Sequence, residues 1–475
     1  MIDLQEDSQR TNATSNEPKQ EKEPINETLS GRVDFPLVNA MTASDRDGSC
    51  SAIHFLWPSS VHLNYRCIYR VPCRLRRVNP EAYTPQMLLI GPLQYHSKKA
   101  QAFELSKNDL RYLDYNKMEQ HKKKYLNNFT LKYGNQTVDE FIRIIKRDEQ
   151  VIRACYAETT ELSSHEFVGM MLLDSVFILV YLSQVGPRYI ENTGDFVFDE
   201  PCHQKTIFED LILLENQLPY ALLENLFEPF FIKLQLNFTF RDITLRAFGL
   251  EENIKKEVKF LHFTDLVRHV RVETLGLTKE EQINQKLMKK NIIKSLHNAD
   301  ELDSAGVQFK GIEKERDTSL VIKFEGGILT MPCLIAEDAT ERILRNIMAL
   351  EQCHYSYTAF VCDYITFLDF LINTEQDVDF LVEKGVIENW LGRPKTVAEM
   401  VNKLCLGIVD FGSHYFNIAE NLNKHYNSRR NRSVATLRRV YFKDLWTGTA
   451  TVTAVVLVLL TLIGTVASVL QMTQK

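Results

Sequence analysis

The stretch GTATVTAVVLVLLTLIGTVASVL, residues 448–470, decides the architecture that this sequence predicts. No charged side chain occurs between Leu445 and Gln474. A helix needs about 20 apolar residues to cross a hydrocarbon core about 30 Å thick, and an isolated span can satisfy its backbone only as a helix. We therefore expect one C-terminal transmembrane helix that contacts the lipid bilayer through residues 448–470. The alternative is a buried core helix, which would need covering on all sides, and little chain follows to cover it.

Basic residues before this stretch predict its orientation. Between Lys424 and Lys443 there are seven Lys or Arg residues and no acidic residue. Cytoplasmic flanks of membrane spans carry an excess of Lys and Arg, so we expect a single-pass protein with the bulk of the chain in the cytoplasm. Whether the membrane is the plasma membrane or an endomembrane stays open. Aromatic side chains gather at the interface and basic ones contact headgroups, so the predicted membrane-interface residues are Arg438, Arg439, Tyr441, Lys443 and Trp446.

The composition excludes several classes of protein. The chain has 475 residues, of which 44% are hydrophobic and 25% charged, with a net charge of −6. This is a globular profile with enough length for a large core, and it offers no basic footprint for nucleic acid. The nine cysteines are scattered, without Cys-x-x-Cys spacing. A zinc ribbon or thioredoxin-type site is therefore not expected, and we predict no metal and no cofactor.

The chain divides into three predicted parts. Residues 1–51 are polar and contain no apolar run of signal-peptide length, so we expect a disordered leader. Residues 52–440 are expected to form one helical body. Residues 441–475 are the predicted juxtamembrane segment and membrane anchor.

The predicted fold class is mainly α, because apolar residues recur at helical spacing through most of the body. The segment EFVGMMLLDSVFILVYL, residues 166–182, is nearly apolar enough to span a membrane. It is only 17 residues long and contains Glu166 and Asp174, which favours a buried core helix. Near residues 306–333 short apolar–polar alternations are separated by charged and Gly-Gly turns, so we expect a small antiparallel β element there.

Three further expectations concern helix boundaries. Pro219 should end or kink the helix predicted over 207–231, because proline lacks an N–H and clashes with the preceding turn. Residues 280–302 have helical spacing. A long basic helix is predicted over 417–441, leading into the membrane span.

No catalytic motif survives inspection, since the sequence lacks a Gly-x-Ser-x-Gly elbow, a phosphate-binding loop and a dinucleotide glycine pattern. Glu209, Asp210 and Glu215 nevertheless form an acidic cluster within an apolar segment. A buried carboxylate is costly unless it is paired, so the cluster is either a structural ion-pair and cap network or a site. We favour the network, with Asp210 near a helix start and Glu215 near the Pro219 kink.

Eight phrases in order along the chain resemble the plant family called "domain of unknown function 247". They are IYRVPCRLRRVNPEAYTPQMLLIGP from Ile68, MEQHKKKYL from Met118, MMLLDSVFI from Met170, EDLILLENQLPYALLENLF from Glu209, AGVQF from Ala305, ILTMPCLIAED from Ile328, RNIMALEQC from Arg345 and YFKDLW from Tyr441. The resemblance implies a land-plant membrane protein with a mainly helical body, a C-terminal anchor and no established enzymatic activity. It also implies kinship with members that take part in grass self-incompatibility and in stress or growth responses.

The favoured function is a membrane-tethered recognition or signalling protein that binds an unidentified protein partner and is not an enzyme. The alternative is an unrecognised hydrolase in which Glu209, Asp210 and Glu215 serve as an acid–base pair or as metal ligands. A homodimer through the anchor is a further hypothesis, because small residues four apart, Ala450 with Ala454 and Gly464 with Ser468, let two helices approach closely.

Overall fold

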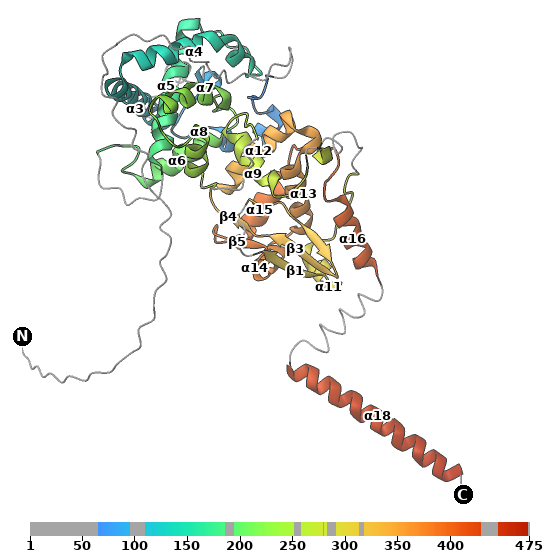
Figure 1. Cartoon of the computed structure of the whole chain (residues 1–475). Helices are drawn as coiled ribbons and strands as arrows, with labels where there is room; N and C mark the ends of the chain where they lie inside the picture. The colour runs from blue at the N-terminus through green and yellow to red at the C-terminus, as the bar shows by residue number, and fades with distance from the viewer. Residues whose placement is uncertain are drawn as a thin grey trace, which may run out of the picture.

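The computed structural model describes residues 65–95, 110–185, 194–250, 258–278, 280–282, 291–312, 318–428 and 445–473. Within these residues the chain is mainly helical with small sheets, which confirms the predicted fold class (Figure 1). The predicted leader, residues 1–51, lies outside the described residues. So do four of the predicted membrane-interface residues, Arg438, Arg439, Tyr441 and Lys443.

Helices α3 to α8 form an N-terminal lobe around α5 (Ser164–Gln184). This is the apolar stretch 166–182. It begins with a capping box in which Ser163 and Glu166 bond each other's backbone amides. Helices α3, α4 and α8 pack on α5, and 78% of its apolar window is buried, which confirms the predicted core helix. The other helices of the lobe are α3 (Leu110–Tyr133), α4 (Asn135–Ala154), α6 (Pro201–Ile212), α7 (Tyr220–Lys233) and α8 (Phe240–Ala247).

The predicted β element near 306–333 is present as a three-stranded sheet of order β1-β3-β2. Strands β2 (Lys323–Glu325) and β3 (Ile328–Pro332) are antiparallel, as expected, and Gly326 and Gly327 between them both have positive φ. Strand β1 (Gln308–Ile312) pairs parallel to β3, so the antiparallel prediction is wrong for this pair. Alternation of apolar residues reports which face of a strand is buried and not the direction of its neighbour.

The remainder of the C-terminal lobe is helical. Its helices are α11 (Ala299–Ser304), α12 (Thr340–His354), α13 (Phe360–Leu371), α14 (Glu375–Glu383), α15 (Pro394–Leu404) and α16 (Phe416–Asn427). A second sheet, which the sequence analysis missed, pairs β4 (Leu334–Ala336) in parallel with β5 (Ile387–Asn389). With only three residues per strand, neither segment carries a recognisable alternation.

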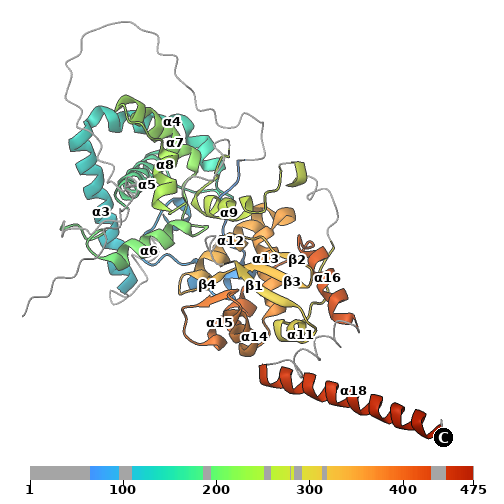
Figure 2. The same ribbon diagram turned by 60° about the horizontal axis from the view of Figure 1, so that its bottom comes forward.

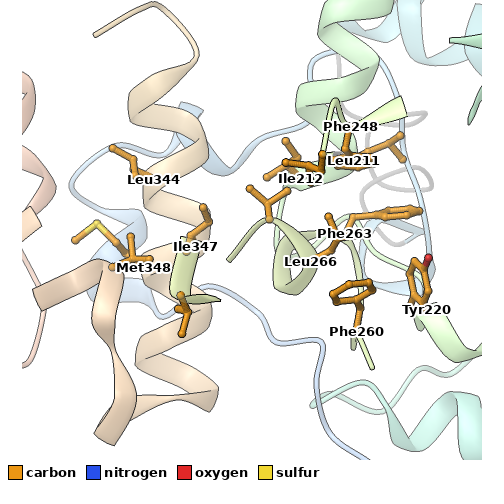
Figure 3. Packing of buried hydrophobic residues seen from close by; sticks show 14 of the residues in the cluster. Leu211, Ile212, Tyr220, Phe248, Phe260, Phe263, Leu266, Leu344, Ile347 and Met348 are labelled. Atoms are coloured by element: carbon orange, nitrogen blue, oxygen red, sulfur yellow. The ribbon is translucent and has the colours of Figure 1, made fainter. Parts of the chain in front are cut away.

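Helix α9 (Phe263–Glu273) joins the two lobes (Figure 2). It packs on α6 of the N-terminal lobe and on α12 and α13 of the C-terminal lobe. Figure 3 shows Leu266 of α9 between Ile212 of α6 and Ile347 of α12. The Phe263 ring of α9 faces Phe248 and Tyr220, with 5.4 and 6.1 Å between ring centroids. One apolar core therefore runs through both lobes.

A buried histidine caps α9. The Asp265 backbone N–H donates to Nδ1 of His262 at 3.4 Å, and the other ring nitrogen lies 3.0 Å from the Cys67 carbonyl oxygen. His262 is fully buried, and this burial lowers its pKa to about 4. The ring is therefore neutral near pH 7, with Nε2–H as the donor to Cys67, which ties α9 to the N-terminal end of the described chain.

The structure corrects three helix boundaries. Residues 291–298 are not helical, because tertiary bonds hold them instead: Ser413 donates to the Asn291 carbonyl and Asn423 to the Ser295 carbonyl. Helix α16, the first part of the helix predicted over 417–441, ends at Asn427, where Ser428 is extended. The rest of that prediction, residues 429–441, lies outside the described residues. Around Pro219 the interruption is wider than a kink, since α6 ends at Ile212 and Pro219 caps α7.

Helix α18 (Leu445–Thr473) differs from every helix above in its burial. It has 29 residues and includes Trp446, and its apolar window Thr451–Ser468 is 0% buried. By length and composition, α5 and α18 are the two helices of the described chain that could cross a membrane. Burial separates them, because α5 packs inside the protein and α18 exposes its apolar side chains.

Gly311 of β1 provides a test of the packing in the C-terminal lobe. Its N–H donates to the Lys384 carbonyl, and an added Cβ would lie 1.8 Å from the backbone oxygen of Gly385. Since backbone atoms cannot rotate away, Gly311→Ala should destabilise the fold by about 3 kcal/mol. Thermal unfolding of the purified chain measures this loss of stability.

The control is Gly169→Ala on the exposed face of α5, where an added Cβ meets nothing within 4 Å. That change should stabilise the helix by about 0.5–1 kcal/mol, and equal melting of the two variants would contradict the described contact.

Candidate functional site

The segment from Cys67 to Leu93, called here the 67–93 segment, crosses the interior with little secondary structure of its own. Between prolines it forms one turn of helix, α1 (Cys73–Arg76), and a 3₁₀ turn, η1 (Glu81–Tyr83). Its residues 87–90 are almost completely buried. Buried backbone N–H and C=O groups need partners, and here side chains from four helices and the α6–α7 connection supply them.

Asp210 holds the middle of this segment. Its carboxylate accepts hydrogen bonds from the backbone N–H groups of Gln86, Met87 and Leu88 at 2.8–3.2 Å. It also pairs with the Arg342 guanidinium of α12 at 2.6 Å. Burial raises the pKa of the Asp210 carboxyl to about 6, against the opposing effects of Arg342 and the three amides. Asp210 therefore has its acceptor capacity taken up by the protein itself.

Glu215 and Asn216, which follow Asp210 in the chain, also form hydrogen bonds with the 67–93 segment. Asn216 accepts from the Ile90 N–H at 2.6 Å and donates to the Leu88 carbonyl at 2.9 Å. Glu215 accepts from the Val71 N–H and from the Arg76 guanidinium, both at 2.6 Å. The peptide between Ile212 and Pro219 is not helical because its side chains bond the 67–93 segment and neighbouring backbone instead.

A buried ion pair holds the end of the segment. Asp174 of α5 accepts from the Gly91 N–H at 2.9 Å and pairs with Lys122 of α3 at 2.7 Å. Lys122 is fully buried and also donates to the Leu89 carbonyl and to Glu119. Burial lowers the pKa of the Lys122 ammonium, but Asp174 and Glu119 outweigh it and the net pKa is raised.

Asp174 stands out in the sequence as a charge within an apolar helix, whereas Lys122 was not predicted to be buried. The signal was present, because Lys122 is spaced with Met118, Tyr125 and Phe129 on the buried face of α3. The surrounding run of lysines hid it, since such a run is typical of a solvated surface.

The three carboxylates of the predicted cluster are not brought together in one pocket. Asp210 lies in the last turn of α6, not near a helix start as expected, and Glu215 lies in the α6–α7 connection. Both bind donors of the protein. Glu209 lines an open cleft, where its carboxylate is half-buried and has no hydrogen bond to the described residues. Burial raises its pKa, and Arg342 and Lys205 partly offset this.

The cleft lies where α6, η1 and the start of α12 meet. It has a volume of about 420 Å³ and is lined by Asn79, Glu81, Ala82, Gln86, Cys202, Lys205, Thr206, Glu209, Asp338, Glu341 and Arg342. A second hollow of about 210 Å³ shares Asp338 and Glu341 with it and adds Glu337, Leu391, Thr396, Glu399, Met400 and Lys403. The two hollows form one surface at the junction of the lobes, with carboxylates outnumbering cationic groups. Such a surface suits Lys or Arg side chains of a bound peptide.

Asp210 and Glu209 are neighbours in sequence with different surroundings, so they form a matched pair for mutation. Asp210→Ala removes the carboxylate that pairs with the buried Arg342 and accepts from three backbone amides, and it should destabilise the fold by about 3–5 kcal/mol. Glu209→Ala removes a half-buried carboxylate at the cleft and should change stability by less than about 1 kcal/mol. Chemical denaturation of both variants measures the difference. Equal destabilisation would contradict the assignment of Asp210 to the network.

Comparison with known proteins identifies the family. The chain is 27% identical over 436 residues to the UPF0481 protein At3g47200 of Arabidopsis thaliana, an alignment that covers 85% of this chain and 86% of that protein. It is 21% identical over 495 residues to the putative UPF0481 protein At3g02645 of Arabidopsis thaliana, covering 83% and 88%. No solved structure matches the chain. The family described as "plant protein of unknown function" matches residues 68–460, which confirms the predicted resemblance. The chain belongs to this plant family, DUF247.

Proposed function

We propose that this protein is a membrane-tethered recognition protein without catalytic activity, and that α18 is its anchor. The observation that carries the proposal is that none of the apolar window Thr451–Ser468 of α18 is buried. Side chains of α18 such as Val452, Leu460 and Ile463 are 54–65% exposed. Its 29 residues correspond to about 44 Å of helix, longer than the roughly 30 Å hydrocarbon core. A lipid bilayer is the cover that fits a helix apolar on every side.

The polar side chains of α18 also suit lipid. The hydroxyls of Thr453, Thr461, Thr465 and Ser468 each donate to the carbonyl four residues earlier, at 2.7–2.8 Å. A hydroxyl that bonds its own helix leaves no unpaired donor in the hydrocarbon region. The same bond engages Ser468 with Gly464, so a dimer through these small residues would rest on close packing and not on a hydroxyl bond between helices.

We further propose that the body faces the cytoplasm. The excess of basic residues between Lys424 and Lys443 supports this orientation. So does the lack of any disulfide among the described residues, since cytosolic thiols stay reduced.

The recognition surface in this proposal is the acidic cleft at the junction of the lobes, and its partner is a protein that presents a basic segment. Asp338 is exposed and lines both hollows, and Glu399 is exposed in the second hollow. The hydrolase alternative has less support, because it needs carboxylates that converge on one reacting bond. Asp210 and Glu215 instead bind buried amides and guanidinium groups.

Removal of the anchor tests the tether. The full chain should stay in the membrane pellet after alkaline carbonate extraction, and a chain lacking residues 445–475 should be released into the supernatant, because about 20 apolar residues hold a span in lipid. Protease added to intact vesicles should digest a tag on the N-terminus. Release of the full chain by carbonate would contradict anchoring, and a protected N-terminal tag would contradict the orientation.

Charge reversal in the cleft tests recognition. With both chains anchored, proximity labelling in plant cells should show the main labelled partners of the wild type reduced about tenfold in the Asp338→Lys, Glu399→Lys double variant, which corresponds to a loss of about 1.4 kcal/mol. The matched control is Asp139→Lys with Glu161→Lys, two exposed residues of the N-terminal lobe outside the cleft. If the two double variants label the same partners as the wild type, the cleft is not the recognition surface.

A further inference from the structure

Three different metal-binding side chains converge at the start of α6. The carboxylate of Glu200, the thiol of Cys202 and the imidazole of His203 have donor atoms that all lie within 4.8 Å of one another. We propose that these residues form a zinc site. The site is separate from the carboxylate network, and the argument for it does not rest on the membrane or partner proposals above.

The backbone at this point leaves the Glu200 carboxylate available. Glu200 is the residue before the helix, and Pro201 occupies the first helical position. The Glu200 side chain makes no capping hydrogen bond to α6. It turns instead toward His203, with 3.5 Å between its Oε2 and the His203 Nε2. Two ligands bound to zinc at about 2.0–2.2 Å in tetrahedral geometry lie about 3.4 Å apart, so this separation already fits a shared ion.

The imidazole is oriented as a zinc ligand. Nδ1 of His203 lies 3.0 Å from the Phe196 carbonyl oxygen, to which it donates in the Nδ1–H tautomer. The Phe196 ring also packs against the imidazole, with 4.3 Å between ring centroids. A hydrogen bond from one ring nitrogen to a backbone carbonyl is the usual outer contact of a zinc-binding histidine, because it fixes the tautomer and aims the lone pair of the other nitrogen. Here that nitrogen is Nε2, which faces Glu200.

The set of ligands selects the metal. A thiolate disfavours Mg²⁺ and Ca²⁺, which prefer oxygen ligands. Sulfur, imidazole nitrogen and carboxylate oxygen together are typical of Zn²⁺. On binding, the Cys202 thiol releases its proton to solvent and the sulfur coordinates as the thiolate. Three protein ligands leave the fourth position to a water molecule, and because Cys202 lines the cleft, the ion would lie at the cleft rim.

The prediction of no metal site rests on the lack of Cys-x-x-Cys pairs in the sequence. The ligands here occupy the short phrase Glu-Pro-Cys-His, residues 200–203, with a single cysteine. The orientation of the His203 ring depends on the turn before α6, which brings the Phe196 carbonyl next to Nδ1 of His203. The four-residue phrase alone does not reveal this contact.

The test uses the full chain in detergent, stripped of metal with a chelator and titrated with Zn²⁺ and, separately, with Co²⁺. The wild type should bind one equivalent of zinc, and its cobalt form should show the near-ultraviolet charge-transfer band of a thiolate ligand together with the visible bands of tetrahedral cobalt. Cys202→Ser should abolish the charge-transfer band. Cys202→Ser and His203→Ala should each weaken zinc binding at least about tenfold.

Two variants outside the cluster serve as controls. Cys73 is an exposed cysteine of the 67–93 segment, and His165 is exposed at the start of α5. Cys73→Ser and His165→Ala should keep the stoichiometry, the affinity and the cobalt spectrum of the wild type. The proposal is overturned if the wild type binds no zinc, in which case Glu200 and His203 form an ion pair only. It is equally overturned if the controls lose binding as the cluster variants do.

Discussion

The structure depends on how one buried, irregular piece of backbone finds its hydrogen bonds. The 67–93 segment runs through the interior without a helix or sheet to pair most of its amides, and a buried amide without a partner costs about 1–3 kcal/mol. Asp210, Asn216, Asp174 and Lys122 provide those partners from α6, the α6–α7 connection, α5 and α3. Each of these elements is therefore fixed in position relative to the 67–93 segment. The ends of α6 and α7 follow from this, since the residues between them are engaged elsewhere.

Buried charges carry much of this arrangement, and each one binds backbone as well as its counter-ion. Arg268 of α9 pairs with Glu351 of α12 at 2.9 Å and donates to the Thr358 carbonyl, while Glu351 accepts from the amides of Val361 and Cys362. A buried ion pair is weak support for stability, because desolvation offsets the attraction between the charges. These buried ion pairs contribute specificity instead, because their hydrogen bonds to backbone groups fix the path of the 67–93 segment and of the turn before α13. An apolar pair of the same size would make no such bonds.

The features that the sequence predicted correctly are those that depend on the spacing of apolar residues and on composition. The helical class, the buried α5 and the exposed apolar run of α18 all follow from patterns of apolar residues, which report burial directly. The direction of β1 against β3, the path of residues 291–298 and the partner of Asp174 depend on contacts between distant positions, and no local pattern encodes them. For the acidic cluster, the structural interpretation described the surroundings of Asp210 and Glu215 well, but it misplaced Asp210 along its helix and did not foresee that Glu209 faces a cleft. The phrases by which the sequence resembles its family contain much of the network, including Lys122, Asp174, Asp210, Asn216 and Glu351.

The distance along the chain between the 67–93 segment and its partners has a consequence for biosynthesis. Arg342 donates to the carbonyl of Thr84, 258 residues earlier, and Asn346 donates to that of Ala82, 264 residues earlier. At about 5–20 residues per second, a ribosome needs roughly 10 to 50 seconds to make the intervening chain. During that interval the early segment is already outside the ribosome but lacks its hydrogen-bond partners from α12. The contacts between the 67–93 segment and α12 can therefore form only after most of the chain has been made, and a chaperone that shields apolar segments has a defined window in which to act.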